Sequence, residues 1–156
     1  MQYWLMKTEP EVFSIQDLAK AKKKTTHWDG VRNYQARNFM RDQMKVGDGV
    51  LIYHSNADPS CVVGTAVVSR EAYPDFTAFD RNDPHYDPKS KVESPTWYMV
   101  DVTFESIFAS PLSLAELRTV AALAKMELLR KGSRLSVQPV RPAEFARICK
   151  LGQSQE

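Results

Sequence analysis

Apolar and β-branched residues gather in five short runs that predict strands. In the first run every position from 3 to 6 is apolar, so both faces of that strand should be covered by other parts of the molecule. The runs at 50–53 and 61–68 are joined by a polar connection that contains Asn, Asp and Pro, which predicts a hairpin. The predicted strands cover residues 3–7, 50–53, 61–68, 97–104 and 134–140.

Helix-start signals and apolar residues at helical spacing predict four helices. Ser14 and Ser113 are each followed three residues later by an acidic residue, which is the arrangement of a capping box. Pro142 suits the first position of a terminal helix, where its missing N–H is not needed. The predicted helices cover residues 14–21, 31–44, 113–129 and 142–148.

The order of these elements indicates the fold class. Strands and helices do not alternate regularly, which argues against a doubly wound parallel sheet. The pattern predicts an α+β fold, a mixed β-barrel of about five to six strands with peripheral helices. We expect a single domain over residues 1–150 and a frayed C-terminal tail over 151–156. Residues 74–96 form a long irregular excursion with four prolines, and such loops are commonly functional or mobile.

Composition places the chain among small globular proteins. Its 156 residues are 43% hydrophobic, enough for one domain with its own core. No run of about 18 apolar residues is present, so we expect no membrane span. The first residues lack the basic start of a signal peptide. The two cysteines are far apart and belong to no motif, so we expect reduced thiols and a cytoplasmic protein.

Charge is distributed unevenly along the chain. Residues 20–45 hold eight basic and two acidic residues, whereas residues 71–105 hold three basic and eight acidic ones. A basic face suits a polyanion such as a nucleic-acid backbone, although residues 20–24 alone fit a solvated loop equally well. The predicted phosphate-binding residues are Lys22, Lys23, Lys24, Arg32, Arg37 and Arg41.

The stretch over residues 28–40 carries the residue types needed to hold a flat ring with polar edges. Its aromatic side chains offer apolar faces, and amides such as Asn33 offer a donor and an acceptor that complement a base edge. Trp28 lies between His27 and Asp29 in a polar loop, so we expect a partly exposed ring that contacts a ligand. A core aromatic is the alternative for this tryptophan.

Other chemistries have little support in the sequence. The three histidines share no metal-ligand spacing with each other or with the cysteines, so neither a metal nor a cofactor is predicted. The Gly-x-Ser-x-Gly motif of serine hydrolases and the signatures of zinc deaminases are absent. Lys7 near Glu9 at a strand end fits a structural hydrogen-bond donor better than a catalytic group. Residues 53–56 either line a site or cap a loop, and Trp97 fits both a core position and a pocket wall.

Five motifs in order resemble the EVE domain family over nearly the whole chain. They lie at residues 4–10, 28–38, 47–48, 53–56 and 133–139. The resemblance implies a PUA-like barrel similar to YTH domains, which read N6-methyladenine in RNA through an aromatic cage. It also implies that Trp28 forms a cage wall. The base-binding residues predicted in this way are Trp28, Asn33, Tyr34, Tyr53, His54, Ser55, Asn56, Trp97, Arg134, Leu135 and Ser136.

The resemblance and the residues together predict a non-catalytic binding module. It would read a modified nucleobase, a modified cytosine or methyladenine in DNA or RNA, in an aromatic pocket. One alternative is an enzyme acting on a nucleobase or nucleotide, because PUA-like relatives include hydrolases. Another is a module that binds a small molecule or a protein partner without nucleic acid. The expected partner is DNA or RNA carrying a modified base, and we expect a monomer with no membrane contact.

Overall fold

A six-stranded mixed sheet forms the centre of the computed structural model, which describes residues 1–153. The strand order is β2-β5-β4-β3-β1-β6, in which β1 and β3 are parallel and all other neighbours are antiparallel. The strands are β1 (Tyr3–Thr8), β2 (Thr25–His27), β3 (Gly49–His54), β4 (Cys61–Pro74), β5 (Tyr98–Ser113) and β6 (Val137–Val140).

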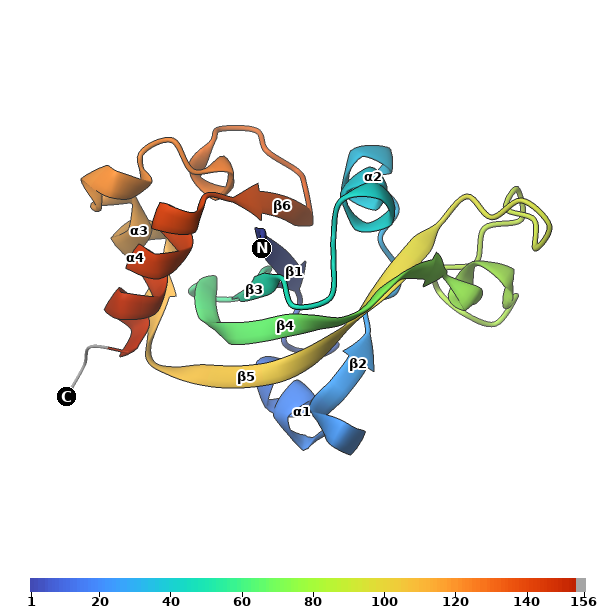
Figure 1. Ribbon diagram of the computed structural model, residues 1–156, viewed down its shortest axis with the longest axis horizontal. Helices are drawn as coiled ribbons and strands as arrows, with labels where there is room; N and C mark the ends of the chain where they lie inside the picture. Colours follow the sequence, from blue (N-terminus) through green and yellow to red (C-terminus); the bar gives the residue numbers. More distant parts are fainter. Residues whose placement is uncertain (154–156) are drawn as a thin grey trace.

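The α+β class predicted from the sequence is confirmed, but the sheet does not close into a barrel. Its two edge strands, β2 and β6, have only three and four residues and do not pair with each other. Figure 1 shows β4 and β5 running across the molecule, with the excursion over residues 75–97 at one end and α4 at the other. The excursion therefore extends away from the C-terminal helix.

Within residues 1–153, four α-helices and four short 3₁₀ turns pack around the sheet. Both predicted capping boxes are present, since Ser14 and Ser113 each accept from the backbone N–H three residues later. The helices are α1 (Ile15–Lys20), α2 (Tyr34–Asp42), α3 (Leu114–Arg118) and α4 (Pro142–Gln153). The 3₁₀ turns are η1 (Lys22–Lys24), η2 (Phe76–Phe79), η3 (Ala121–Leu123) and η4 (Glu127–Leu129). Within residues 1–153 no helix is both long and apolar enough to cross a membrane.

Several element boundaries differ from the sequence predictions. The helix predicted over 113–129 ends at Arg118; Val120 takes an extended backbone, and the chain continues in η3 and η4. Strand β2 was not predicted, because three residues carry too short a pattern. Helix α4 continues to Gln153, three residues into the predicted frayed tail, and the rest of that tail lies outside the described residues.

Apolar side chains cover both faces of the two parallel strands. Trp4 and Met6 of β1 belong to one buried cluster, which also includes Trp28, whereas Leu5 points into a second cluster that includes Ile148 of α4. This double coverage confirms the expectation from the unbroken apolar run at the N-terminus. It also fixes β1 and β3 rigidly, and the candidate site lies at their C-terminal ends.

Candidate functional site

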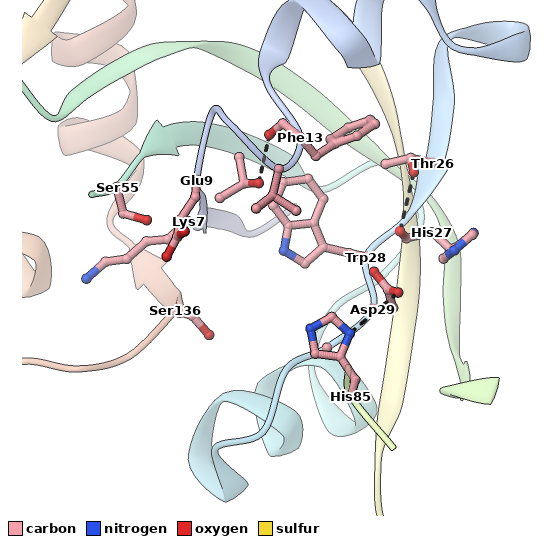
Figure 2. A pocket seen from close by; sticks show the side chains of 13 residues that line it. Lys7, Glu9, Phe13, Thr26, His27, Trp28, Asp29, Ser55, His85 and Ser136 are labelled. Atoms are coloured by element: carbon pink, nitrogen blue, oxygen red, sulfur yellow. Dashed lines mark hydrogen bonds and ion pairs between the residues drawn. The ribbon is translucent and has the colours of Figure 1, made fainter. Parts of the chain in front are cut away.

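A half-open cavity of about 640 Å³ lies at the C-terminal ends of β1 and β3 (Figure 2). This volume falls within the range of cavities that hold small ligands, about 300–1,000 Å³. The cavity is formed by segments that are far apart in the sequence. Its lining residues are Lys7, Thr8, Glu9, Val12, Phe13, Thr26, His27, Trp28, Asp29, Gly30, Ser55, His85 and Ser136.

Three strands bring one wall of the cavity together. In the parallel ladder Thr8 of β1 lies opposite His54 of β3, and the N–H of Ser55 donates to the Thr8 carbonyl at 3.0 Å. On the other side of β1, the N–H of Lys7 donates to the carbonyl of Ser136 at 2.9 Å. Backbone hydrogen bonds therefore place Lys7, Ser55 and Ser136 around the same space.

The opposite wall is the loop between β2 and α2. The N–H of Trp28 donates to the carbonyl of Val100 at 2.7 Å, which continues the pairing of β2 with β5. Trp28 is only 7% exposed, so the partly exposed ring predicted from the sequence is wrong. The indole fills the space between the core cluster and the cavity. Figure 2 shows its nitrogen on the side of the ring toward Lys7 and Ser136.

Gly30 is required where the loop meets His85. Its φ of +78° lies in the left-handed region, and a Cβ at this position would lie 2.6 Å from the His85 ring. The imidazole therefore packs directly against the glycine backbone. His85 belongs to the acidic excursion, so this contact attaches the excursion to the cavity.

Asp75 holds the loop between β2 and α2 in place through hydrogen bonds. Its side chain is fully buried and accepts from the N–H of Gly30 at 2.8 Å and from Nη1 of Arg32 at 3.0 Å. Burial acts to raise the pKa of Asp75, but hydrogen bonds from Thr77, Gly30 and Arg32 outweigh it, and the pKa lies below its ordinary value. The guanidinium also donates to the carbonyl of His85 at 2.8 Å. Arg32, predicted to bind phosphate, thus has its donors engaged within the protein.

Several polar groups in the cavity have no hydrogen-bond partner among the described residues. The side chains of Glu9 and Asp29 offer free acceptors, and Nε1 of Trp28 offers a free donor. Burial lowers the pKa of the Lys7 ammonium, while the charge of Glu127 acts in the opposite direction. The Lys7 ammonium lies 5.9 Å from the ring centre of Tyr53 and makes no hydrogen bond. These groups remain available to a ligand.

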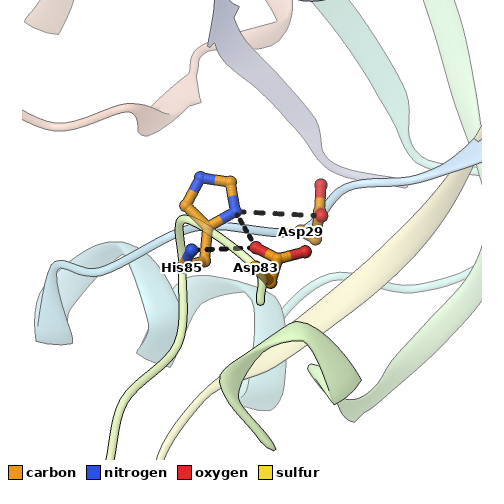
Figure 3. A group of neighbouring side chains, drawn as sticks. All are labelled: Asp29, Asp83 and His85. Carbon is orange, nitrogen blue, oxygen red and sulfur yellow. Dashed lines mark hydrogen bonds and ion pairs between the residues drawn. The ribbon is translucent and has the colours of Figure 1, made fainter. Parts of the chain in front are cut away.

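Asp29, Asp83 and His85 form a cluster at the edge of the cavity (Figure 3). Nδ1 of His85 lies 3.3 Å from Asp83 Oδ1 and 3.9 Å from Asp29 Oδ2. Among the described residues this is the group that could offer three ligands to a divalent metal ion, since the ligand atoms lie within 4.8 Å of one another. Acidic clusters of this kind are common without a metal ion, so no metal is assigned to this one.

The EVE domain profile matches residues 2–151 of this chain. The chain belongs to the EVE domain family. Thymocyte nuclear protein 1 of Rattus norvegicus is 46% identical over 170 residues, covering 98% of this chain and 74% of that protein. The Homo sapiens protein of the same name is 44% identical, covering 98% and 75%.

Solved structures agree with this assignment. A crystal structure of human THYN1 protein in complex with DNA containing 5-methylcytosine superposes with a TM-score of 0.93 at 43% identity, and the match covers 100% of both chains. A hypothetical protein from Leishmania major gives a TM-score of 0.92 at 51% identity, covering 97% of this chain and 94% of that one. The PUA-like architecture implied by the sequence motifs is thereby confirmed.

Three of the predicted base-binding residues line the cavity of this EVE domain, namely Trp28, Ser55 and Ser136. Two others flank it. Nε2 of His54 accepts from the N–H of Ile15 at 3.0 Å, and burial lowers the pKa of this imidazole. Tyr53 is buried in the second core cluster. The other predicted base-binding residues of the motifs at 53–56 and 133–139 lie outside the cavity lining. Leu135 belongs to the first core cluster, and Asn56 and Arg134 are exposed.

The other predicted aromatic residues form a separate group. Tyr34, which is 60% exposed, stacks on Trp97 with ring centres 4.9 Å apart, and the guanidinium of Arg37 lies 5.0 Å from the Tyr34 ring. Nε1 of Trp97 donates to Asp87 at 2.7 Å. Neither aromatic residue is part of the cavity lining, so a role in base binding stays a prediction for both.

Asn33 caps the helix that follows the cavity loop. Its side-chain oxygen accepts from the N–H of Ala36 at 2.9 Å, and its extended backbone makes α2 begin at Tyr34. The predicted helix over 31–44 is therefore shorter at its start. Since the acceptor of the Asn33 amide is engaged in the cap, the structure supports a helix-capping role more directly than a base-reading one.

Replacing Asn33 by alanine is expected to lower the free energy of unfolding by about 1 kcal/mol, because α2 loses its N-cap acceptor. Urea denaturation followed by circular dichroism measures this change. Asn33→Asp keeps an acceptor at the same position and should stay close to the wild type. Unchanged stability in Asn33→Ala, together with loss of DNA binding, would instead favour the base-edge role predicted from the sequence.

Sequence reasoning missed most of the cavity lining. Lys7 was interpreted as a structural donor, yet its ammonium makes no hydrogen bond within residues 1–153. Asp29 stands in the motif next to Trp28, which was the one available signal for it. His85 lies far from the motif in the sequence and carried no signal of its own. Only the fold brings His85 onto Gly30.

Proposed function

We propose that this EVE domain binds DNA that contains a modified cytosine and takes the modified base into the cavity beside Trp28. The observation that carries the proposal is the match, over the whole of both chains, to the structure of human THYN1 protein in complex with 5-methylcytosine-containing DNA. The chains are 43% identical over this match, and the TM-score is 0.93. A shared ligand class is the simplest interpretation of such a likeness.

The cavity supports this proposal by its size and its chemistry. A base that leaves the helical stack needs an enclosed space with polar groups that meet its edge. The cavity of about 640 Å³ offers both acceptors and donors that no protein group occupies, among them Asp29, Ser136 and the indole N–H of Trp28. Phe13 and Trp28 supply aromatic surface at the same place. An aromatic pocket is thus part of the proposal.

Binding without catalysis is the favoured activity. Ser55 and Ser136 are the hydroxyl groups with a free side chain in the cavity, and within residues 1–153 neither hydroxyl is hydrogen-bonded to a histidine that would activate it. An enzyme that acts on a nucleobase remains the second hypothesis from the sequence. Product analysis by mass spectrometry after incubation with the DNA would reveal such an activity.

The basic residues outside the cavity are proposed to contact phosphate. Lys22, Lys23 and Lys24 form the exposed turn η1, close in sequence to the cavity loop. Arg41 lies on α2 and pairs with Asp42 at the surface. Arg37, also on α2, donates to the Thr96 carbonyl and to the Asn38 side chain, so like Arg32 it has its guanidinium engaged within the protein. Contacts with phosphate would make affinity for DNA fall as salt concentration rises.

The name of the relatives, thymocyte nuclear protein 1, contains the word nuclear. A cytoplasmic location stays a prediction for this chain.

Duplex DNA with one central 5-methylcytosine is expected to bind about fourfold more tightly than the unmodified duplex. This factor corresponds to the free energy of burying one methyl group, about 0.8 kcal/mol. Fluorescence anisotropy of labelled duplexes measures both dissociation constants. Duplexes with N6-methyladenine and single-stranded RNA of the same sequence serve as comparisons. Equal affinity for the methylated and unmethylated DNA, or tighter binding of modified RNA, would contradict the proposal.

A further inference from the structure

The carboxylate of Asp29 is an acceptor at the cavity wall that has no hydrogen-bond donor within residues 1–153. Its side chain is 32% exposed, and its one recorded contact among the described residues is His85 Nδ1 at 3.9 Å, which is too long for a hydrogen bond. Figure 2 shows Asp29 and His85 together on the side of the cavity next to Trp28. The carboxylate is therefore accessible and accepts no hydrogen bond from the described residues.

The backbone holds Asp29 in place from both sides. The residue before it, Trp28, donates its N–H to Val100 at 2.7 Å, and the residue after it, Gly30, donates its N–H to the buried Asp75 at 2.8 Å. These bonds fix where the Asp29 side chain leaves the backbone, and its two torsions let the carboxylate reach a smaller space than the longer side chain of Glu9 can. A fixed attachment point is one requirement for a group that discriminates between ligands.

Cytosine and thymine differ at the edge that such a carboxylate would face. Cytosine presents an N4 amino donor where thymine presents the O4 acceptor. A carboxylate is acceptor-only, so it can accept from the amino group but is left unpaired and repelled opposite O4. Thymine carries the same 5-methyl group as 5-methylcytosine, which means that methyl packing alone cannot separate the two bases.

We propose that Asp29 is the specificity-determining residue that selects 5-methylcytosine against thymine, by accepting a hydrogen bond from the N4 amino group. This inference rests on the proposed function of the cavity and names the contact that makes it selective for cytosine. A buried polar group left unpaired by the wrong base discriminates far more strongly than a methyl group does. Selection between the two 5-methylated bases thus depends on the carboxylate.

Glu9 is the competing acceptor in the same cavity. It is exposed, whereas Asp29 is half-buried, and it has one more side-chain torsion to fix. The carbonyl of Glu9 accepts from Val12 and Phe13, but its carboxylate has no partner within residues 1–153. Its position favours contact with solvent over contact with a base edge. Glu9→Gln removes the same charge from the same cavity and is the matched control for Asp29→Asn.

The test compares two duplexes that differ in one base, 5-methylcytosine or thymine, each placed opposite an abasic site so that neither base has a pair to break. Dissociation constants are measured by fluorescence anisotropy in buffer with EDTA, which removes any metal from the Asp29, Asp83 and His85 cluster. The wild type should bind the 5-methylcytosine duplex at least about tenfold more tightly, since one good base-edge contact has this effect. Asp29→Asn should reduce the ratio to about threefold or less, and Glu9→Gln should leave it unchanged.

Each other outcome overturns a specific statement. An unchanged ratio in Asp29→Asn, or loss of the ratio in Glu9→Gln instead, would overturn the role of Asp29. Equal weakening of both duplexes by Asp29→Asn, with an unchanged melting temperature, would mean that the carboxylate holds the DNA without reading the base. A wild type that prefers 5-methylcytosine over cytosine but does not reject thymine would also overturn the role of Asp29. The proposed function would stand in that case. A wild type indifferent to cytosine methylation would contradict the proposed function itself.

Discussion

Replacing Trp28 by alanine is expected to lower the free energy of unfolding by about 3–5 kcal/mol. The indole is 7% exposed and belongs to the buried cluster that contains Trp4, Met6 and Met40. Truncation would leave a void between this cluster and the cavity that the surrounding side chains cannot fill. Urea denaturation at neutral pH measures the loss. The substitution should also abolish specific binding, because the cavity loses the wall that the indole forms.

Trp28→Phe separates the two roles of this residue. The phenyl ring retains much of the packing but lacks the indole N–H, which has no partner among the described residues. We expect a smaller loss of stability than in Trp28→Ala and a clear loss of affinity for the methylated duplex. A melting temperature near the wild-type value in Trp28→Ala would show that the ring contributes little to the core. That result would contradict the contribution to the core that its burial predicts.

Replacing Asp75 by alanine is expected to destabilise the protein by about 3–5 kcal/mol, because the donors of Gly30, Thr77 and Arg32 all lose their buried acceptor. The carboxylate accepts from Gly30, Thr77 and Arg32, and its side chain is fully buried. Loss of these bonds also releases the loop that carries Trp28. Thermal and urea denaturation should both report the change, and a shift close to zero in both would contradict it.

Asp75→Asn is the matched control, since it retains the shape and removes the charge. The pKa of Asp75 lies below its ordinary value, so the folded protein binds the proton less tightly than the unfolded chain does. The stabilisation is therefore complete at neutral pH and is lost as the pH falls from about 3.9 through the lower folded value. The stability advantage of the wild type over Asp75→Asn should shrink over that acidic range. A constant difference from neutral to acidic pH would contradict this account.

The regular part of the fold could be predicted because it depends on local patterns. The apolar run of β1 and the capping boxes at Ser14 and Ser113 each indicate their structure from neighbouring residues alone. The short strand β2 could not be predicted, since it exists only through its pairing with β5. The break after Arg118 depends on where Leu123 must be buried, which is also a property of the whole fold.

The candidate site could be predicted only in part, because contacts between residues far apart in the sequence leave no local pattern. Trp28, Ser55 and Ser136 stand in motifs, whereas His85 reaches the cavity through its contact with Gly30 and through Arg32, which donates to its carbonyl. The sequence indicates a basic Arg32 but not its buried partner. A side chain that could bind a ligand, judged from the sequence, can already have its hydrogen-bond partners within the folded protein.

The pairing of β1 with β6 has a consequence for the order in which the site is assembled. Tyr3 pairs with Val140, so the first and last strands are neighbours in the sheet, and Ser136 reaches the cavity through a backbone bond to Lys7. Contacts between such distant parts of a chain form slowly, because a long loop must be closed first. A chain emerging from the ribosome therefore has no complete cavity until β6, up to Val140, has been synthesised. Binding competence should arise late and in one step, together with the cooperative folding of the whole sheet.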